Sequence, residues 1–61
     1  MPYVNIRVAG ELSRDQKKKI VAGVTEVISK EAGKPESSII IFIDEEKREN
    51  IAKGGKLLDD V

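Results

Sequence analysis

The second residue of the chain, Pro2, is the residue whose type and position point most specifically to acid–base chemistry. Proline is the amino acid whose α-nitrogen is a secondary amine, and removal of Met1 makes that nitrogen the free amino terminus. An ordinary α-amino group titrates near 7.7–8.0, and burial in an apolar site lowers this pKa because it disfavours the charged form. With its pKa lowered to about 7, such an amine is half neutral at physiological pH and can act as a general base. The alternative interpretation is structural, since proline is also tolerated at the start of a strand.

Other groups for nucleophilic or acid–base catalysis are scarce. The chain has no histidine and no cysteine, which excludes a Ser/His/Asp triad, a Cys/His pair and the usual zinc-ligand sets. Gly54-Gly55-Lys56 lacks the earlier glycine of a phosphate-binding loop. Asp44-Glu45-Glu46 lacks the alternating oxygen ligands and the turn glycine of a calcium loop, and a solvated acidic loop is the simpler interpretation. We therefore expect neither a metal nor a cofactor.

Two groups of cationic residues each allow more than one interpretation. Lys17, Lys18 and Lys19 follow one another in a stretch of helical character, where a solvated face is the simplest explanation. Arg7 is expected on a strand, either as an ion-pair partner at an interface or as a clamp for an anionic ligand.

Length and charge restrict the class of protein. The 61 residues are predicted to form one domain, residues 1–61, and a domain of this size buries only about 60% of its unfolded surface. Lysine plus arginine equals aspartate plus glutamate, at 11 each, and the aromatic residues are one tyrosine and one phenylalanine, which argues against nucleic acid as a partner. No apolar run has the length of a membrane span and no secretory signal is recognisable, so the expected location is the cytoplasm.

The first stretch of the chain predicts a strand. Residues 2–9 alternate apolar and polar side chains, and this period of two gives a strand with one apolar face. The residues of that face are Val4, Ile6 and Val8.

A capping box marks the start of a helix. Ser13 is followed three residues later by Gln16, so the serine oxygen can accept from an early helix N–H while the glutamine reaches back. Gly33 suits the left-handed conformation at a helix end, and Pro35 cannot continue the helix. The sequence therefore predicts a helix at about 14–32, with one apolar face made by Ile20, Val21, Val24, Val27 and Ile28.

The second half of the chain predicts a strand, a loop and a small hairpin. Residues 39–43 are an unbroken apolar, mostly β-branched run, which is typical of a strand that is apolar on both faces. Residues 44–50 are charged and are expected to form a loop, with a helical turn as an option. Residues 51–58 carry Gly54-Gly55 between short apolar pieces, which favours a hairpin, and the acidic tail behind it is expected to fray.

The order of these elements determines the topology. Two strands joined through a helix are parallel with a right-handed crossover, so the predicted class is α+β: a β-α-β unit followed by a short C-terminal β-hairpin. One helix covers one face of this sheet, whereas residues 39–43 are apolar on both faces and Tyr3 lies opposite the valine face. The uncovered face predicts a partner, and we expect a homo-oligomer.

Four segments taken in order carry a resemblance to a known family. They are residues 1–6 (MPYVNI), 12–18 (LSRDQKK), 40–45 (IIFIDE) and 49–55 (ENIAKGG). Together they resemble the 4-oxalocrotonate tautomerase family, within the tautomerase superfamily of N-terminal proline enzymes, over essentially the whole chain. The resemblance implies that Pro2 is the general base of a tautomerase, an isomerase that moves a proton between keto and enol forms of a small 2-hydroxydienoate or 2-oxo acid. It also implies a fold completed by oligomerisation, as a homohexamer built from three dimers.

The chain departs from the family pattern at three positions. Leu12 and Ile40 stand where the resemblance places two arginines that hold substrate carboxylates, and Ile51 replaces an aromatic residue of the apolar wall. Leucine and isoleucine cannot bind a carboxylate, so another group must. Lys53 is placed near a neighbouring subunit's site by the resemblance, although it can also be an ordinary exposed lysine. The candidate substrate-binding residues are Lys53, Ser38, Ile51 and Arg7.

Three functions are compatible with this pattern. The first is a tautomerase that depends on Pro2. The second is a related enzyme that uses the same amine for hydrolytic dehalogenation or decarboxylation. The third is a non-catalytic or weakly active oligomeric homologue that has lost the substrate-binding arginines. All catalytic versions require removal of Met1, because an amide nitrogen at Pro2 has no basicity.

Overall fold

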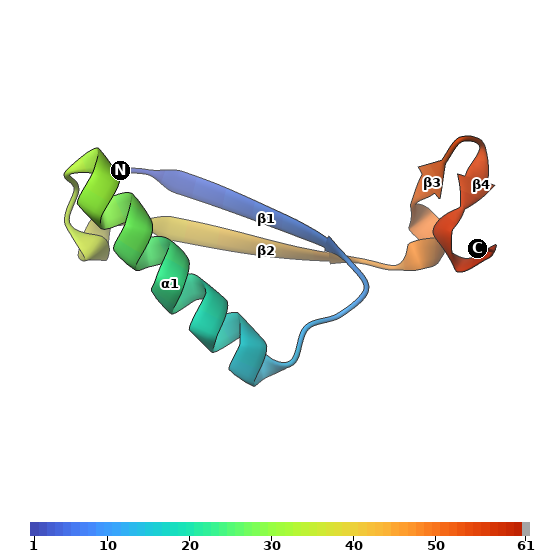
Figure 1. The fold of residues 1–61 in the computed structure, drawn as a ribbon, viewed down its shortest axis with the longest axis horizontal. Helices are drawn as coiled ribbons and strands as arrows, with labels where there is room; N and C mark the ends of the chain where they lie inside the picture. The colour runs from blue at the N-terminus through green and yellow to red at the C-terminus, as the bar shows by residue number, and fades with distance from the viewer. Residues whose placement is uncertain (61) are drawn as a thin grey trace.

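A computed structural model describes residues 1–60 as a β-α-β unit followed by a small hairpin (Figure 1). This confirms the predicted α+β class and its element order. The helices and strands are β1 (Tyr3–Ala9), α1 (Arg14–Ala32), β2 (Ile40–Glu46), β3 (Ala52–Lys53) and β4 (Lys56–Leu57), with single 3₁₀ turns at Glu36–Ser38, Arg48–Asn50 and Leu58–Asp60.

The two long strands pair in parallel along their whole length. The register runs from Tyr3 opposite Ile40 to Ala9 opposite Glu46. Just before the paired stretch of β1, the Ile40 N–H donates to the Pro2 carbonyl oxygen at 3.0 Å; beyond it, the Gly10 N–H donates to the Glu46 carbonyl oxygen at 2.7 Å. These bonds anchor the residue before β1 and the residue after it, while α1 lies along one face of the pair (Figure 1).

The helix begins and ends where its caps predict. Ser13 Oγ accepts from the Gln16 N–H at 3.1 Å, and Gln16 Oε1 accepts from the Ser13 N–H at 2.8 Å. Gly33 has a φ of 67°, the left-handed conformation that glycine adopts at little cost, and its N–H donates to the Ser29 carbonyl oxygen. Within residues 1–60, no helix is both long enough and apolar enough to cross a membrane.

The second strand is longer than its apolar run predicts. The predicted loop at 44–50 is wrong for its first three residues, because β2 continues through Glu46 and pairs there with Arg7–Ala9 of β1. Two of these three charged side chains have partners: Asp44 Oδ2 accepts from Asn5 Nδ2 at 3.1 Å, and Glu45 Oε1 lies 2.6 Å from Lys17 Nζ. The optional helical turn is present at Arg48–Asn50.

The C-terminal hairpin forms around the predicted glycine pair. Gly54 and Gly55 have φ values of 63° and 83°, the two positive φ angles that a tight two-residue hairpin requires, and Lys53 lies opposite Lys56. The expectation of a frayed tail is wrong for Asp59 and Asp60, which belong to the 3₁₀ turn that starts where the Leu58 N–H donates to the Ile51 carbonyl oxygen at 2.8 Å. Val61 lies outside the described residues.

A single copy of the chain has no fully buried side chain among residues 1–60. The sheet face toward α1 is half-buried, but on the opposite face Tyr3 and Phe42 remain 69% and 52% exposed. The Cα radius of gyration is 14.7 Å, whereas a compact domain of this length has about 10.5 Å. The accessible surface is 4881 Å², against about 3,900 Å² for a compact monomer of this mass. The chain therefore has the shape of a thin plate with an arm, which leaves its outer sheet face without cover.

Candidate active site

Pro2 lies immediately before β1, next to the first residues of β2. It is half-buried, and its carbonyl oxygen is fixed by the hydrogen bond from the Ile40 N–H at 3.0 Å. The preceding Met1 is 72% exposed. The backbone of Pro2 is therefore fixed on its carbonyl side, while its nitrogen side faces the end of the molecule.

An apolar surface begins directly beside Pro2, on the sheet face away from α1. The rings of Tyr3 and Phe42 meet edge to face, with centroids 6.4 Å apart and an interplanar angle of 86°. Ile40 adjoins them as the register partner of Tyr3, and it is 36% exposed. Such a surface lowers the local dielectric only when another molecule covers it. A second molecule is therefore needed before this surface can lower the pKa of a free Pro2 amine.

Ser38 lies in the 3₁₀ turn just before β2, at the Pro2 end of the sheet. Its Oγ donates to the Pro35 carbonyl oxygen at 2.8 Å and its residue is half-buried. The hydroxyl proton is thus used within the turn, so Ser38 can offer a ligand only its acceptor lone pair.

A pocket of about 560 Å³ lies at the opposite end of the sheet, where β1 and β2 finish. It brings together two residues that the sequence singled out, Arg7 and Ile51, with two polar residues that sequence reasoning missed, Glu46 and Asn50. The signal for Glu46 was the spacing of two along Phe42, Asp44 and Glu46, which places all three on one strand face once β2 is known to continue. The remaining lining residues are Val8, Ala9 and Ala52.

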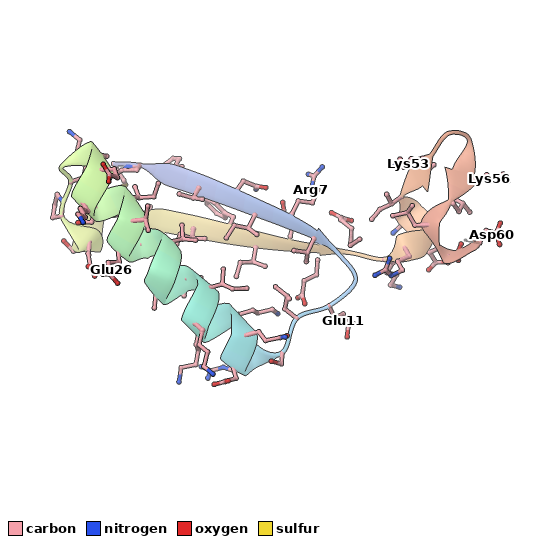
Figure 2. The ribbon with its side chains drawn as sticks, in the orientation of Figure 1. Arg7, Glu11, Glu26, Lys53, Lys56 and Asp60 are labelled. Atoms are coloured by element: carbon pink, nitrogen blue, oxygen red, sulfur yellow. The ribbon has the colours of Figure 1, made fainter. Side chains whose placement is uncertain are left out.

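Lys53 lies beyond this pocket, on the exposed hairpin (Figure 2). It faces Lys56 across the two strands, and no carboxylate within residues 1–60 lies within 4.0 Å of either ammonium group. The N-terminus and the hairpin stand at opposite ends of a molecule whose longest dimension is 42 Å (Figure 1). One chain therefore separates Pro2 and Ser38 from Arg7, Ile51 and Lys53.

Leu12, one of the two positions where the family resemblance places an arginine, is held by a carboxylate. Glu45 Oε2 accepts from the Leu12 N–H at 2.8 Å while Glu45 Oε1 accepts from Lys17 Nζ at 2.6 Å. The hydrogen bond from Lys17 and, next, that from Leu12 lower the pKa of the Glu45 carboxyl below its ordinary value of 4.5. Glu45 thereby ties the loop after β1 and the first turn of α1 to the end of β2.

No cluster of three metal-ligating side chains is found in the part of the chain that the structure describes.

Comparison with known proteins gives matches along nearly the whole chain. Residues 2–60 match a family model described as tautomerase enzyme. A probable tautomerase of Bacillus cereus is 38% identical over 60 residues, which cover 98% of each chain. The 2-hydroxymuconate tautomerase of Bacillus subtilis (strain 168) is 34% identical over 61 residues, covering all of this chain and 98% of that one. Among solved structures, YwhB, a homologue of 4-oxalocrotonate tautomerase, superposes with a TM-score of 0.92 at 33% identity over 98% of both chains.

Proposed function

This chain belongs to the tautomerase family and is an isomerase of that class, and from that premise we propose that Pro2, freed by removal of Met1, is its general base. The proposed reaction is keto–enol tautomerisation of a small 2-hydroxydienoate or 2-oxo acid.

The observation that carries this proposal is the position of Pro2 in a chain without histidine or cysteine. A free proline amine is then the group whose ordinary pKa lies nearest to neutrality. Its half-buried place next to Tyr3, whose ring meets that of Phe42, supports a further fall of that pKa once another copy covers this surface, because an apolar cover disfavours the ammonium form.

The proposed proton transfers balance within the substrate. The neutral Pro2 nitrogen takes the proton of the enol hydroxyl, and the oxygen's electron pair forms the carbonyl while the conjugated double bond shifts. The resulting ammonium then returns the proton to the carbon that has gained electron density, which restores the neutral amine. No oxidant, cofactor or water is consumed.

We further propose that the working site is assembled from more than one copy of the chain, in a homohexamer of three dimers. Pro2 lies at one end of the sheet, and the pocket with Arg7 and Ile51 lies at the other end, between the sheet and the hairpin. The exposed Tyr3 and Phe42 supply apolar area for the contact between copies. Lys53, on the projecting hairpin, is then free to approach the Pro2 end of a neighbour and to attract an anionic substrate.

The test is turnover by the processed protein. Intact mass establishes whether Met1 has been removed, and ultraviolet absorbance follows the ketonisation of phenylenolpyruvate and of 2-hydroxymuconate. Pro2→Ala keeps a free amine but loses the secondary one, and we expect a rate at least ~100-fold lower with the oligomer intact. The matched control is the chain's other proline: Pro35→Ala should leave the rate unchanged. Equal rates for the Pro2→Ala variant and the parent contradict the proposal.

One specific feature favours a second candidate function. Leu12 and Ile40 are apolar at the positions where the family resemblance places arginines, which suits a weakly active or non-catalytic oligomeric homologue. A processed, correctly assembled protein that turns over neither substrate would support this alternative.

A further inference from the structure

We propose that the pocket at the carboxyl end of the sheet binds the carboxylate and the hydroxyl of a 2-hydroxy acid, the stable counterpart of an enol substrate, through Arg7 and Glu46. This inference rests on the proposed function for the reaction, but the binding can be measured separately from turnover.

The pocket has the size and composition of a small-molecule site. Its volume of about 560 Å³ lies within the range of roughly 300–1,000 Å³ that is typical for such sites. Its apolar side is formed by Val8, Ala9, Ile51 and Ala52, and its polar groups are Arg7, Glu46 and Asn50. A mostly apolar wall with a few polar groups binds the body of a ligand and orients its functional groups.

Arg7 has most of its hydrogen-bonding capacity free. Its guanidinium lies 3.9 Å from Asp44 Oδ2, and the same oxygen already accepts from Asn5 Nδ2 at 3.1 Å. The Arg7 side chain is 70% exposed and projects from β1 on the side away from α1 (Figure 2). A guanidinium carries five N–H donors in a planar fork, which matches a carboxylate in a bidentate arrangement.

Glu46 is fixed in place but keeps its carboxylate available. The Gly10 N–H bonds to its main-chain oxygen at 2.7 Å, whereas no side-chain hydrogen bond or ion pair engages its carboxylate within residues 1–60. The preceding residue differs, because Glu45 points to the helix side and is held by Lys17 and Leu12. An ionised carboxylate only accepts hydrogen bonds, so Glu46 selects a ligand group that donates one, such as a hydroxyl.

Together the two side chains define a class of ligand. Arg7 favours one carboxylate, while Glu46 favours a hydroxyl and repels a second carboxylate placed against it. The pocket thus suits a monocarboxylic 2-hydroxy or enol acid better than a dicarboxylate. Glu46 becomes a specificity-determining residue for the reaction.

The binding test uses three unreactive probes that differ by one group each. Phenyllactate carries both the carboxylate and the hydroxyl, phenyllactamide lacks the charge, and 3-phenylpropanoate lacks the hydroxyl. In an NMR titration of the assembled protein, we expect phenyllactate to shift the backbone amides of residues 7–9 and 50–52, and both other probes to bind at least tenfold more weakly. Shifts confined to other parts of the molecule, or equal dissociation constants for the three probes, overturn the proposal.

Substitutions assign the two roles. Arg7→Gln should weaken phenyllactate at least tenfold and bring it level with phenyllactamide. Glu46→Leu, which has no hydrogen-bond acceptor, should remove the preference for phenyllactate over 3-phenylpropanoate. Arg14→Gln, at the exposed start of α1, is the matched control and should bind as the parent does. If Arg7→Gln fails to assemble, Arg7→Lys retains the charge without the fork, and an unchanged dissociation constant for that variant contradicts the role of Arg7.

Turnover separates this inference from the proposed function. Glu46→Gln should raise kcat/KM for 2-hydroxymuconate relative to phenylenolpyruvate, because the repelling charge is gone. Pro2→Ala should bind phenyllactate as tightly as the parent while losing activity. A parent protein that binds the probe in this pocket without turnover contradicts the proline mechanism alone, and one that turns over without any shift at the pocket contradicts this inference alone.

Discussion

The carboxylate of Glu45 links three parts of the fold: β2, the loop after β1 and the first turn of α1. Its two carboxylate oxygens accept from Lys17 on α1 and from the Leu12 N–H in the loop, while its backbone belongs to β2. Both hydrogen bonds are stronger to the ionised form, which is why the pKa of this carboxyl is lowered in the folded protein. The position of Leu12 therefore depends on the charge of Glu45.

This linkage gives a prediction about acid. Because the folded-state pKa of Glu45 lies below the unfolded value, its stabilising contribution is present above the ordinary value of 4.5 and is lost as pH falls through the folded-state pKa. Glu45→Gln should thus lower the urea midpoint at pH 7, and the difference from the parent should shrink at acid pH.

Urea unfolding at several pH values, at one fixed protomer concentration, checks this. Glu26→Gln is the control, because Glu26 is exposed on α1 (Figure 2) and should leave the midpoint unchanged at every pH. A Glu45→Gln difference that does not depend on pH speaks against the linkage.

The hairpin lysines offer a second prediction at the scale of single residues. Lys53 and Lys56 lie directly opposite each other, an arrangement that repels without a bound anion. If Lys53 approaches a neighbour's site, Lys53→Ala should raise KM for a carboxylate substrate several-fold and leave kcat little changed. Lys56→Ala is the matched control on the other strand. Steady-state kinetics of the two variants decide the matter, and an unchanged KM for Lys53→Ala excludes that lysine from substrate binding.

At the scale of elements, the helix is stabilised at its start by the reciprocal bonds of Ser13 and Gln16. Ser13→Ala removes the acceptor for the Gln16 N–H and should destabilise the protein by about 1 kcal/mol per chain. Ser37→Ala tests the same change at an exposed serine before β2 and should have little effect. Thermal unfolding of both variants measures the difference, and equal melting temperatures contradict the role of the cap.

The elements that the sequence predicts are those whose signals are local. Residues 14–32 carry a capping box and a glycine terminator, and Gly54-Gly55 marks the hairpin turn, so these elements match the structure closely. The end of β2 has no such signal, because Asp44 to Glu46 favours a loop by composition and becomes a strand only through pairing with β1. The same tertiary pairing places Glu46 beside Ala9 and Ile51, which is why the pocket could not be predicted from the sequence.

At the scale of the whole molecule, a single copy keeps the proposed base, Pro2, and the proposed carboxylate-binding residue, Arg7, at opposite ends of the sheet. Pro2 and the pocket lie at opposite ends of the sheet, and the N-terminus and the hairpin stand at the two extremes of the long axis (Figure 1). The outer sheet face with Tyr3 and Phe42 has no cover from its own chain. The resemblance and the unbroken apolar run at residues 39–43 predict association. The sequence does not show which residues of a site come from which copy. That assignment needs the structure, which puts Pro2 and the pocket at opposite ends of the sheet.

Mixing two impaired variants tests whether each site draws Pro2 and Arg7 from different copies. Copies carrying Pro2→Ala lack the proposed base but keep the pocket, whereas copies carrying Arg7→Gln keep the base and lack the carboxylate clamp. When equal amounts are unfolded together and refolded, random assembly of a site from two different copies should restore about a quarter of the parent activity, because one site in four draws both intact residues. If Pro2 and Arg7 of the same chain formed each site, every site would carry one defect and no activity would return. Refolding each variant alone supplies the baseline, and mass spectrometry of the intact assemblies verifies that the copies have mixed.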